Sequence, residues 1–237
     1  MTPEQVFGEL LRSEPSRPFV TYYDEATGER TELSVKSLAN WVAKTHHLLV
    51  DDLDLGVGDT ALVAIQPHWI AYPVLLGCMT AGLALTPREV TGIAVAFVDP
   101  EHLDEAKGMA DIYAVSPGSA AVGFRDEAPD ETSDYVTAVR PQPDKWVTVH
   151  MPATGSDPCL PSATRAEVIT HAQARAAELG LTRGARLLIT ADWTAADAWL
   201  DALFVPLAIG GSVVLVRNAS EETLTRRAEQ ERVDLVL

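Results

Sequence analysis

The 237-residue sequence has no long apolar run, no basic cluster and only two cysteines. Its apolar runs are short and interrupted, which argues against a membrane-spanning helix. The N-terminus lacks the basic and apolar segments that open a secretory signal peptide. Two cysteines, Cys78 in an apolar helical run and Cys159 in a loop, are poor evidence for a disulfide framework. We therefore expect a cytoplasmic protein with free thiols.

Positive charge is also scarce, because 18 Lys and Arg residues stand against 34 Asp and Glu residues, for a formal net charge of −16. Nothing in the sequence offsets this with a basic run, so binding to nucleic acid or to an anionic membrane is not expected. Acidity of this kind commonly serves solubility. At 47% hydrophobic and 22% charged residues, the composition is that of a globular protein with a sizeable core.

The patterns that usually carry catalysis or metal binding are missing. The six histidines are scattered, and no His, Cys or Asp cluster has zinc spacing. His46 and His47 are neighbours on a predicted helix, where their side chains point about 100° apart. Ser156 lacks the Gly-x-Ser-x-Gly elbow of a hydrolase. A Gly-x-Gly pattern at residues 56–58 precedes a strand instead of following one, which indicates a turn and no dinucleotide site. We predict no metal site and no catalytic residue.

One unit of strand, helix and strand occurs twice along the chain. The first copy has its strands at 61–65 and just before Pro87, and the second has them at 186–190 and 212–216. Apolar strands joined by helices are typical of a buried parallel sheet. The sequence therefore predicts an α/β fold with two doubly wound αβα lobes. We place the first lobe at residues 1–140, with an N-terminal hairpin, and the second, incomplete lobe at residues 141–237.

Other segments complete the predicted fold. The following elements are expected: a hairpin of strands at 19–23 and 30–33, strands at 93–98, 112–115, 146–149 and 233–237, and helices at 101–109 and 221–232. Residues 118–144 hold six acidic residues and three prolines with little apolar period. We expect this span to connect the two lobes.

Two pairs of side chains occupy equivalent places after the first strand of each repeated unit. They are His68 with Trp69 and Asp192 with Trp193. Parallel sheets bind ligands at the carboxyl edge of their strands, so these four residues are our candidates for contact with a ligand. The alternative is that each Trp covers the end of a core.

The most informative stretch is the loop at residues 153–161, which reads Ala-Thr-Gly-Ser-Asp-Pro-Cys-Leu-Pro. A small-residue loop between a strand and a helix can present N–H groups to a phosphate, usually with a Lys beside it. Here a carboxylate opposes phosphate, the prolines remove N–H donors, and the nearest cation is Arg165. We expect a vestigial nucleotide-binding loop or an ordinary polar loop. Its candidate residues are Thr154, Gly155, Ser156 and Asp157.

In their order and spacing, several segments resemble the N-terminal part of the acyl-adenylate-forming enzymes, which include acyl-CoA synthetases, adenylation domains and luciferases. They are Leu33-Ser34-Val35-Lys36-Ser37-Leu38, Gly58-Asp59 before a strand, and Pro87 five residues after Gly82. The family's phosphate loop reads Thr-Ser-Gly-Thr-Thr-Gly-x-Pro-Lys-Gly. Gly155 aligns with its first Gly, whereas Pro158 replaces the second Gly and Pro161 replaces the Lys. The chain also resembles a set of short actinobacterial proteins related to these enzymes.

The resemblance implies an N-terminal half whose later motifs, including the adenine-binding segment and the catalytic Lys, would lie beyond Leu237. Two functions follow. In the first, the chain lacks adenylating activity, needs no cofactor, and is a binding or interaction module that forms a homo-oligomer or binds a protein partner. In the second, it is an ATP- and Mg-dependent acid-activating ligase, alone or completed by another polypeptide.

Overall fold

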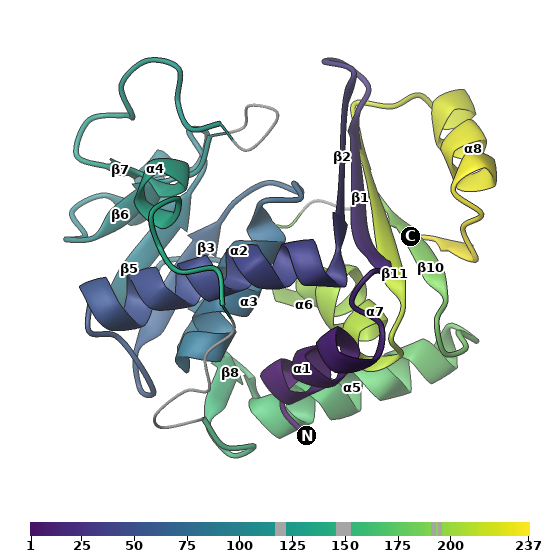
Figure 1. The fold of residues 1–237 in the computed structure, drawn as a ribbon, viewed down its shortest axis with the longest axis horizontal. Helices are drawn as coiled ribbons and strands as arrows, with labels where there is room; N and C mark the ends of the chain where they lie inside the picture. Colours follow the sequence, from purple (N-terminus) through teal and green to yellow (C-terminus); the bar gives the residue numbers. More distant parts are fainter. Residues whose placement is uncertain (117–121, 146–152, 191–192, 194–195) are drawn as a thin grey trace.

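Two five-stranded sheets face each other across a layer of helices (Figure 1). The computed structural model describes residues 1–116, 122–145, 153–190, 193 and 196–237. The first sheet, called the parallel sheet here, has the order β4-β3-β5-β6-β7 with every pair parallel. Its strands are β3 (Thr60–Ala64), β4 (Ala84–Thr86), β5 (Ile93–Val98), β6 (Ile112–Ala114) and β7 (Ser133–Asp134). The predicted α/β class with parallel strands and covering helices is confirmed.

The second sheet, called the mixed sheet here, combines the two ends of the chain. It has the order β12-β10-β11-β1-β2, and only the β1–β2 pair is antiparallel. Its strands are β1 (Pro18–Asp24), β2 (Glu29–Ser34), β10 (Arg186–Ile189), β11 (Ser212–Arg217) and β12 (Leu235–Val236).

The predicted hairpin therefore forms, but it does not lie with the other strands of residues 1–140. β1 and β11 are buried along nearly their whole length, so each needs a neighbour on both edges, and they supply this to each other. The predicted division into domains at residue 140 stays a prediction.

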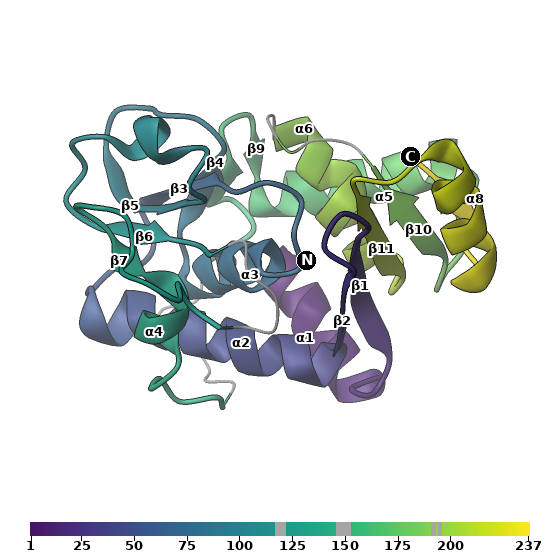
Figure 2. The ribbon, with the colours of Figure 1, turned by 90° about the horizontal axis from the view of Figure 1, so that it is seen from above.

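A shared helical layer fills the space between the sheets (Figure 2). It contains α1 (Pro3–Ser13), α2 (Val35–His47), α3 (Ala71–Ala81), α5 (Arg165–Glu178) and α7 (Val205–Ala208). All eleven residues of α3 are buried, as expected of a helix that is apolar on every side. On β3, Ala61 and Val63 face this layer, while Leu62 and Ala64 face the opposite side. Period-two alternation thus gives each sheet an inner and an outer face.

The second crossover is broken where one helix was predicted. It consists of α6 (Ala196–Trp199), the π-helix η3 (Leu200–Phe204) and α7. Pro206 has no N–H to donate to the carbonyl of Ala202, and the hydroxyl of Tyr72 donates to that carbonyl instead at 2.8 Å. The buried carbonyl that the proline leaves without its helical partner is therefore paired by a side chain, within a π-helical turn.

The outer face of the parallel sheet is covered by a short 3-10 turn, η2 (Leu103–Ala106), and the predicted helix at 101–109 is wrong. The carboxylate of Asp99 accepts the N–H of Glu101 at 3.0 Å and holds the chain in a turn. Gly108, with φ of 82°, ends the turn. No helix within the described parts of the chain has the length and apolarity that a membrane crossing needs.

Residues 122–145 do more than connect two lobes. β7 pairs with β6, and α4 (Tyr135–Val139) buries Tyr135 and Val139. The hydroxyl of Tyr135 lies 2.7 Å from that of Thr45 on α2. Prolines and acidic residues obscured this short element in the sequence. The strand predicted at 146–149 lies outside the described residues.

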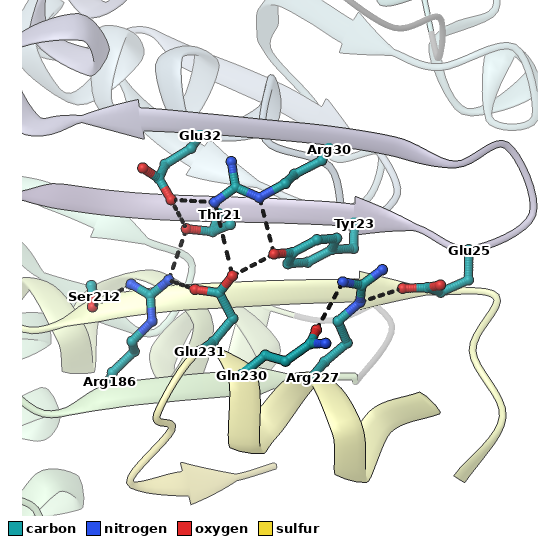
Figure 3. A network of polar contacts seen from close by, with 10 residues as sticks. All are labelled: Thr21, Tyr23, Glu25, Arg30, Glu32, Arg186, Ser212, Arg227, Gln230 and Glu231. Atoms are coloured by element: carbon teal, nitrogen blue, oxygen red, sulfur yellow. Dashed lines mark hydrogen bonds and ion pairs between the residues drawn. The ribbon is translucent and has the colours of Figure 1, made fainter. Parts of the chain in front are cut away.

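A polar network fastens α8 (Glu221–Gln230) to the outer face of the mixed sheet (Figure 3). α8 has no fully buried residue, so polar contacts carry much of its attachment. The Glu231 carboxylate accepts from the hydroxyl of Tyr23 and, at 2.5 Å, from Arg186. Arg227 donates to Glu25 at 2.7 Å and lies 4.0 Å from the ring centroid of Tyr23. Burial raises the pKa of Glu231, but the bonds from Tyr23 and Arg186 outweigh it and hold this pKa below its ordinary value.

Replacing Glu231 with Gln is expected to lower the free energy of unfolding at pH 7 by about 1 kcal/mol, since the lost charge-assisted bonds are partly screened by solvent. A depressed pKa stabilises the fold above the ordinary value of 4.5, and this stabilisation disappears as the pH falls through the folded-state pKa. Urea unfolding should therefore show a larger difference between the two proteins at pH 7 than at about pH 3. Glu178→Gln, at a carboxylate 70% exposed, is the matched control. An equal difference at both pH values would contradict this account.

Candidate functional site

The carboxyl edges of both sheets open onto one cavity of about 550 Å³. After β3 the chain enters α3 on the inner face, and after β5 it enters η2 on the outer face. Such a divergence of connections opens a crevice where α/β proteins bind ligands. The lining residues are Ala64, Ile65, Gln66, Pro67, Pro87, Arg88, His102, Glu105 and Trp193. The size and the mixture of apolar and polar groups suit a small molecule.

A polar cluster lies beside this cavity, centred on the buried carboxylate of Asp99. It accepts the N–H of Gln66 at 2.7 Å, the N–H of Glu101 at 3.0 Å and Nδ1 of His102 at 2.7 Å. Arg217, at the end of β11, donates to the side-chain oxygen of Gln66 and so links the two sheets. This cluster was not predicted from the sequence. The signal that could have found it is Asp99, which directly follows a predicted strand, because residues after β3 became candidates for a similar reason.

His68 and Trp69 are both buried, and neither is among the residues that line the cavity. Nδ1 of His68 accepts the N–H of Ile70 at 3.2 Å, and its Nε2 lies 3.9 Å from Glu29 on β2. Nε1 of Trp69 donates to the same carboxylate at 3.3 Å. Burial raises the pKa of Glu29, but the nearby His68 and the hydrogen bonds from Thr31 and Trp69 outweigh it and lower this pKa. In the structure, these two candidate residues join β2 to the loop after β3.

Trp193 is the predicted candidate that reaches the cavity. It is 5% exposed, lines the cavity wall, and packs edge-on against Tyr72 with ring centroids 5.5 Å apart. Asp192 lies outside the described residues. Of the four predicted candidates, the structure thus places Trp193 in the cavity wall, while His68 and Trp69 are buried and do not line the cavity. Whether any of them contacts a ligand stays a prediction.

In the loop of residues 153–161, the carboxylate of Asp157 accepts hydrogen bonds from groups of the same loop. Asp157 accepts the N–H of Thr154 at 2.5 Å and its hydroxyl at 3.0 Å, and this hydroxyl lies 2.9 Å from that of Ser156. These bonds from Thr154 lower the pKa of Asp157. The carbonyl of Gly155 accepts the N–H of Ala166. The N–H and the hydroxyl of Thr154 are therefore bound to Asp157 and are not free to donate to a phosphate.

The chain after this loop forms a small antiparallel hairpin of β8 (Pro158–Leu160) and β9 (Ala163–Thr164), which leads into α5. Thr164 caps α5 in a capping box with Glu167. The position aligned with a lysine, Pro161, is exposed in the turn between the two strands.

The nearest cation, Arg165, points inward and is fully buried. Its guanidinium donates to the carbonyl of Met79, in the last turn of α3, at 2.9 Å and to that of Leu83, just after this helix, at 2.8 Å. It also lies 3.1 Å from Glu4 on α1. Arg165 thus joins three helices, and its charge is unavailable to a ligand at the loop. No group of three His, Cys, Asp or Glu side chains in the described ranges could hold a metal ion.

No family model matches the sequence. Over 235 residues the chain is 37% identical to the "TIGR03089 family protein" of Mycobacterium tuberculosis, and the match covers 96% of this chain and 94% of that protein. The chain belongs to the TIGR03089 family. The predicted resemblance to a short actinobacterial relative is confirmed by this match.

Solved structures show what fold this TIGR03089 family chain has. The Brucella canis acyl-CoA synthetase matches with a TM-score of 0.80 at 16% identity, over 100% of this chain and 47% of that one. The anthranilate CoA ligase AuaEII, in complex with anthranoyl-AMP, matches with a TM-score of 0.74 at 13% identity, over 98% of this chain and 48% of that one. The chain spans about half the length of these enzymes. Its fold is that of the N-terminal subdomain of acyl-CoA synthetases.

Proposed function

We propose that this protein is an acyl-CoA synthetase homologue that lacks adenylating activity and works as a binding or interaction module in the cytoplasm. The loop around Asp157 carries the proposal. Its carboxylate accepts the bonds of Thr154, a proline stands at the lysine position, and Arg165 is bound inward. Catalysis of phosphate chemistry depends on donors and cations aimed at developing negative charge. The described part of this loop presents a carboxylate instead.

The features that remain suit binding. The cavity at the carboxyl edges has the size of a small-molecule site. β12 forms an edge of the mixed sheet, and Val236 there is 49% exposed, which supports association with a second copy or another protein. The net charge of −16 opposes nucleic acids and anionic membranes as partners. The proposed module uses no cofactor.

The second candidate function is an ATP-dependent acid-activating ligase completed by another polypeptide. The observation that favours it is the close match of fold to one half of two solved acyl-CoA-forming enzymes. A second polypeptide would then have to supply the groups that bind ATP and Mg.

Exchange of labelled pyrophosphate into ATP tests this proposal. The purified protein, offered ATP, Mg and a broad panel of carboxylic acids, is expected to show no exchange above a heat-treated sample. Exchange that is abolished in Gly155→Ala or Ser156→Ala would overturn the proposal. Exchange that appears only with a second polypeptide present would establish the ligase alternative.

A further inference from the structure

His102 lies where it can contact a ligand in the cavity, and the proposed function gives it no role. It begins the η2 turn after β5, lines the cavity, and has a side chain that is 30% exposed. No partner of its Nε2 occurs among the described residues. Three other histidines also hold an unpaired ring nitrogen, but those atoms of His46, His47 and His68 are buried away from solvent. His102 is thus the histidine whose free nitrogen a cavity ligand can reach.

Asp99 fixes the proton on the ring of His102. An ionised carboxylate only accepts hydrogen bonds, so Nδ1 of His102 must be the donor in their 2.7 Å contact. Neutral His102 therefore keeps its lone pair on Nε2. The N–H groups of Gln66 and Glu101 hold Asp99 in place from the other sides. A carboxylate that orients a histidine in this way fixes both the tautomer and the direction of the ring.

The orientation selects the chemistry of the ligand. A lone pair on Nε2 accepts a hydrogen bond, so a ligand that carries a hydrogen-bond donor fits neutral His102. Glu105, on the same turn, adds a second acceptor to the cavity wall. Pro67, Pro87 and Trp193 supply an apolar wall on which an aromatic ring can pack.

We propose that the cavity binds a small aromatic alcohol whose hydroxyl donates to Nε2 of His102, with Asp99 as the positioning residue. This inference rests on the proposed role of the protein as a binding module. With an acidic phenol the proton passes to Nε2: the phenol O–H bond breaks, an N–H bond forms, and a phenolate lies beside an imidazolium that Asp99 stabilises. No other reactant is required.

Titration with 4-nitrophenol tests the proposal, because its phenolate is yellow and its phenol is not. At about pH 6 the wild-type protein should bind the probe saturably and increase the phenolate absorbance. His102→Gln should weaken binding at least tenfold, which is about 1.4 kcal/mol, and remove the colour change. Asp99→Asn should reduce the colour change. His171→Gln, at an exposed histidine on α5, is the matched control and should bind as the wild type does.

A second ligand separates hydrogen bonding from apolar contact. 4-Nitroanisole has the same ring without the hydroxyl donor, and it should bind at least tenfold more weakly than 4-nitrophenol. Equal binding of the two ligands, equal binding by His102→Gln, or no saturable binding at millimolar probe would each overturn the inference. These outcomes leave the proposed function standing, because pyrophosphate exchange decides it separately.

Discussion

Replacing Arg165 with Met is expected to lower the free energy of unfolding by about 3–5 kcal/mol. The substitution removes the donors to two buried carbonyls, those of Met79 and Leu83, and the ionic partner of Glu4. A buried acceptor left without a donor costs its full desolvation, about 1–3 kcal/mol each. Urea unfolding followed by circular dichroism measures the loss.

Two variants test whether the lost stability comes from the buried hydrogen bonds of the guanidinium or only from the removal of a positive charge. Arg183→Met, at a side chain 82% exposed, should change stability by no more than about 0.5 kcal/mol. Glu4→Gln leaves both carbonyl bonds in place and should cost less than Arg165→Met. If Arg165→Met were as mild as Arg183→Met, the guanidinium would not be the internal staple described above, and it could face the loop instead.

Trp69→Ala is expected to lower the free energy of unfolding by a similar amount, about 3–5 kcal/mol. The side chain is 1% exposed, packs edge-on against Trp41 with ring centroids 5.8 Å apart, and donates to Glu29. Truncation leaves a cavity between the sheets and removes one of the two hydrogen bonds to the same Glu29 oxygen, which keeps the bond from Thr31. Trp69→Phe keeps part of the packing and should cost about 1–2 kcal/mol. Calorimetric or urea unfolding of the three proteins gives the order.

The Trp69 series also distinguishes the two roles considered for this residue. A side chain that covers the core changes stability whether or not a ligand is present. Unchanged stability in Trp69→Ala would contradict the structural role and return Trp69 to the ligand-contacting candidates.

Local pattern in the sequence was enough to predict most strands and helices. Residues 61–65, 93–98 and 186–190 are largely apolar runs of strand length, and each overlaps an observed strand, β3, β5 and β10. Partner choice could not be predicted in the same way. β1 and β11 are separated by most of the chain, and strands buried on both faces carry no alternation that would identify their neighbour.

The candidate site could likewise be predicted only where local residue types determine it. The residue types of the loop predicted that Asp157 would oppose phosphate, and this depends only on charge. The inward direction of Arg165 depends on carbonyls more than 80 positions away in the sequence, so no local pattern contains it. The Asp99–His102 pair was missed because an acidic turn after a strand is common in sequences. Its relevance to ligand binding follows from its place beside the cavity, which opens where the connections after β3 and β5 diverge.

We infer that the loop at residues 153–161 no longer holds a nucleotide. Thermal unfolding with millimolar ATP and Mg tests this inference most directly. Ligand at about a hundred times its dissociation constant would stabilise the fold by about 2.7 kcal/mol and raise the unfolding midpoint by several degrees. The wild-type protein should show no shift, while a double variant with Asp157→Thr and Pro161→Lys, which restores a neutral loop and a cation, is the matched comparison. No shift in the wild type, with or without a response of the double variant, is the predicted result. A shift of several degrees in the wild type would show a working nucleotide site and contradict the account.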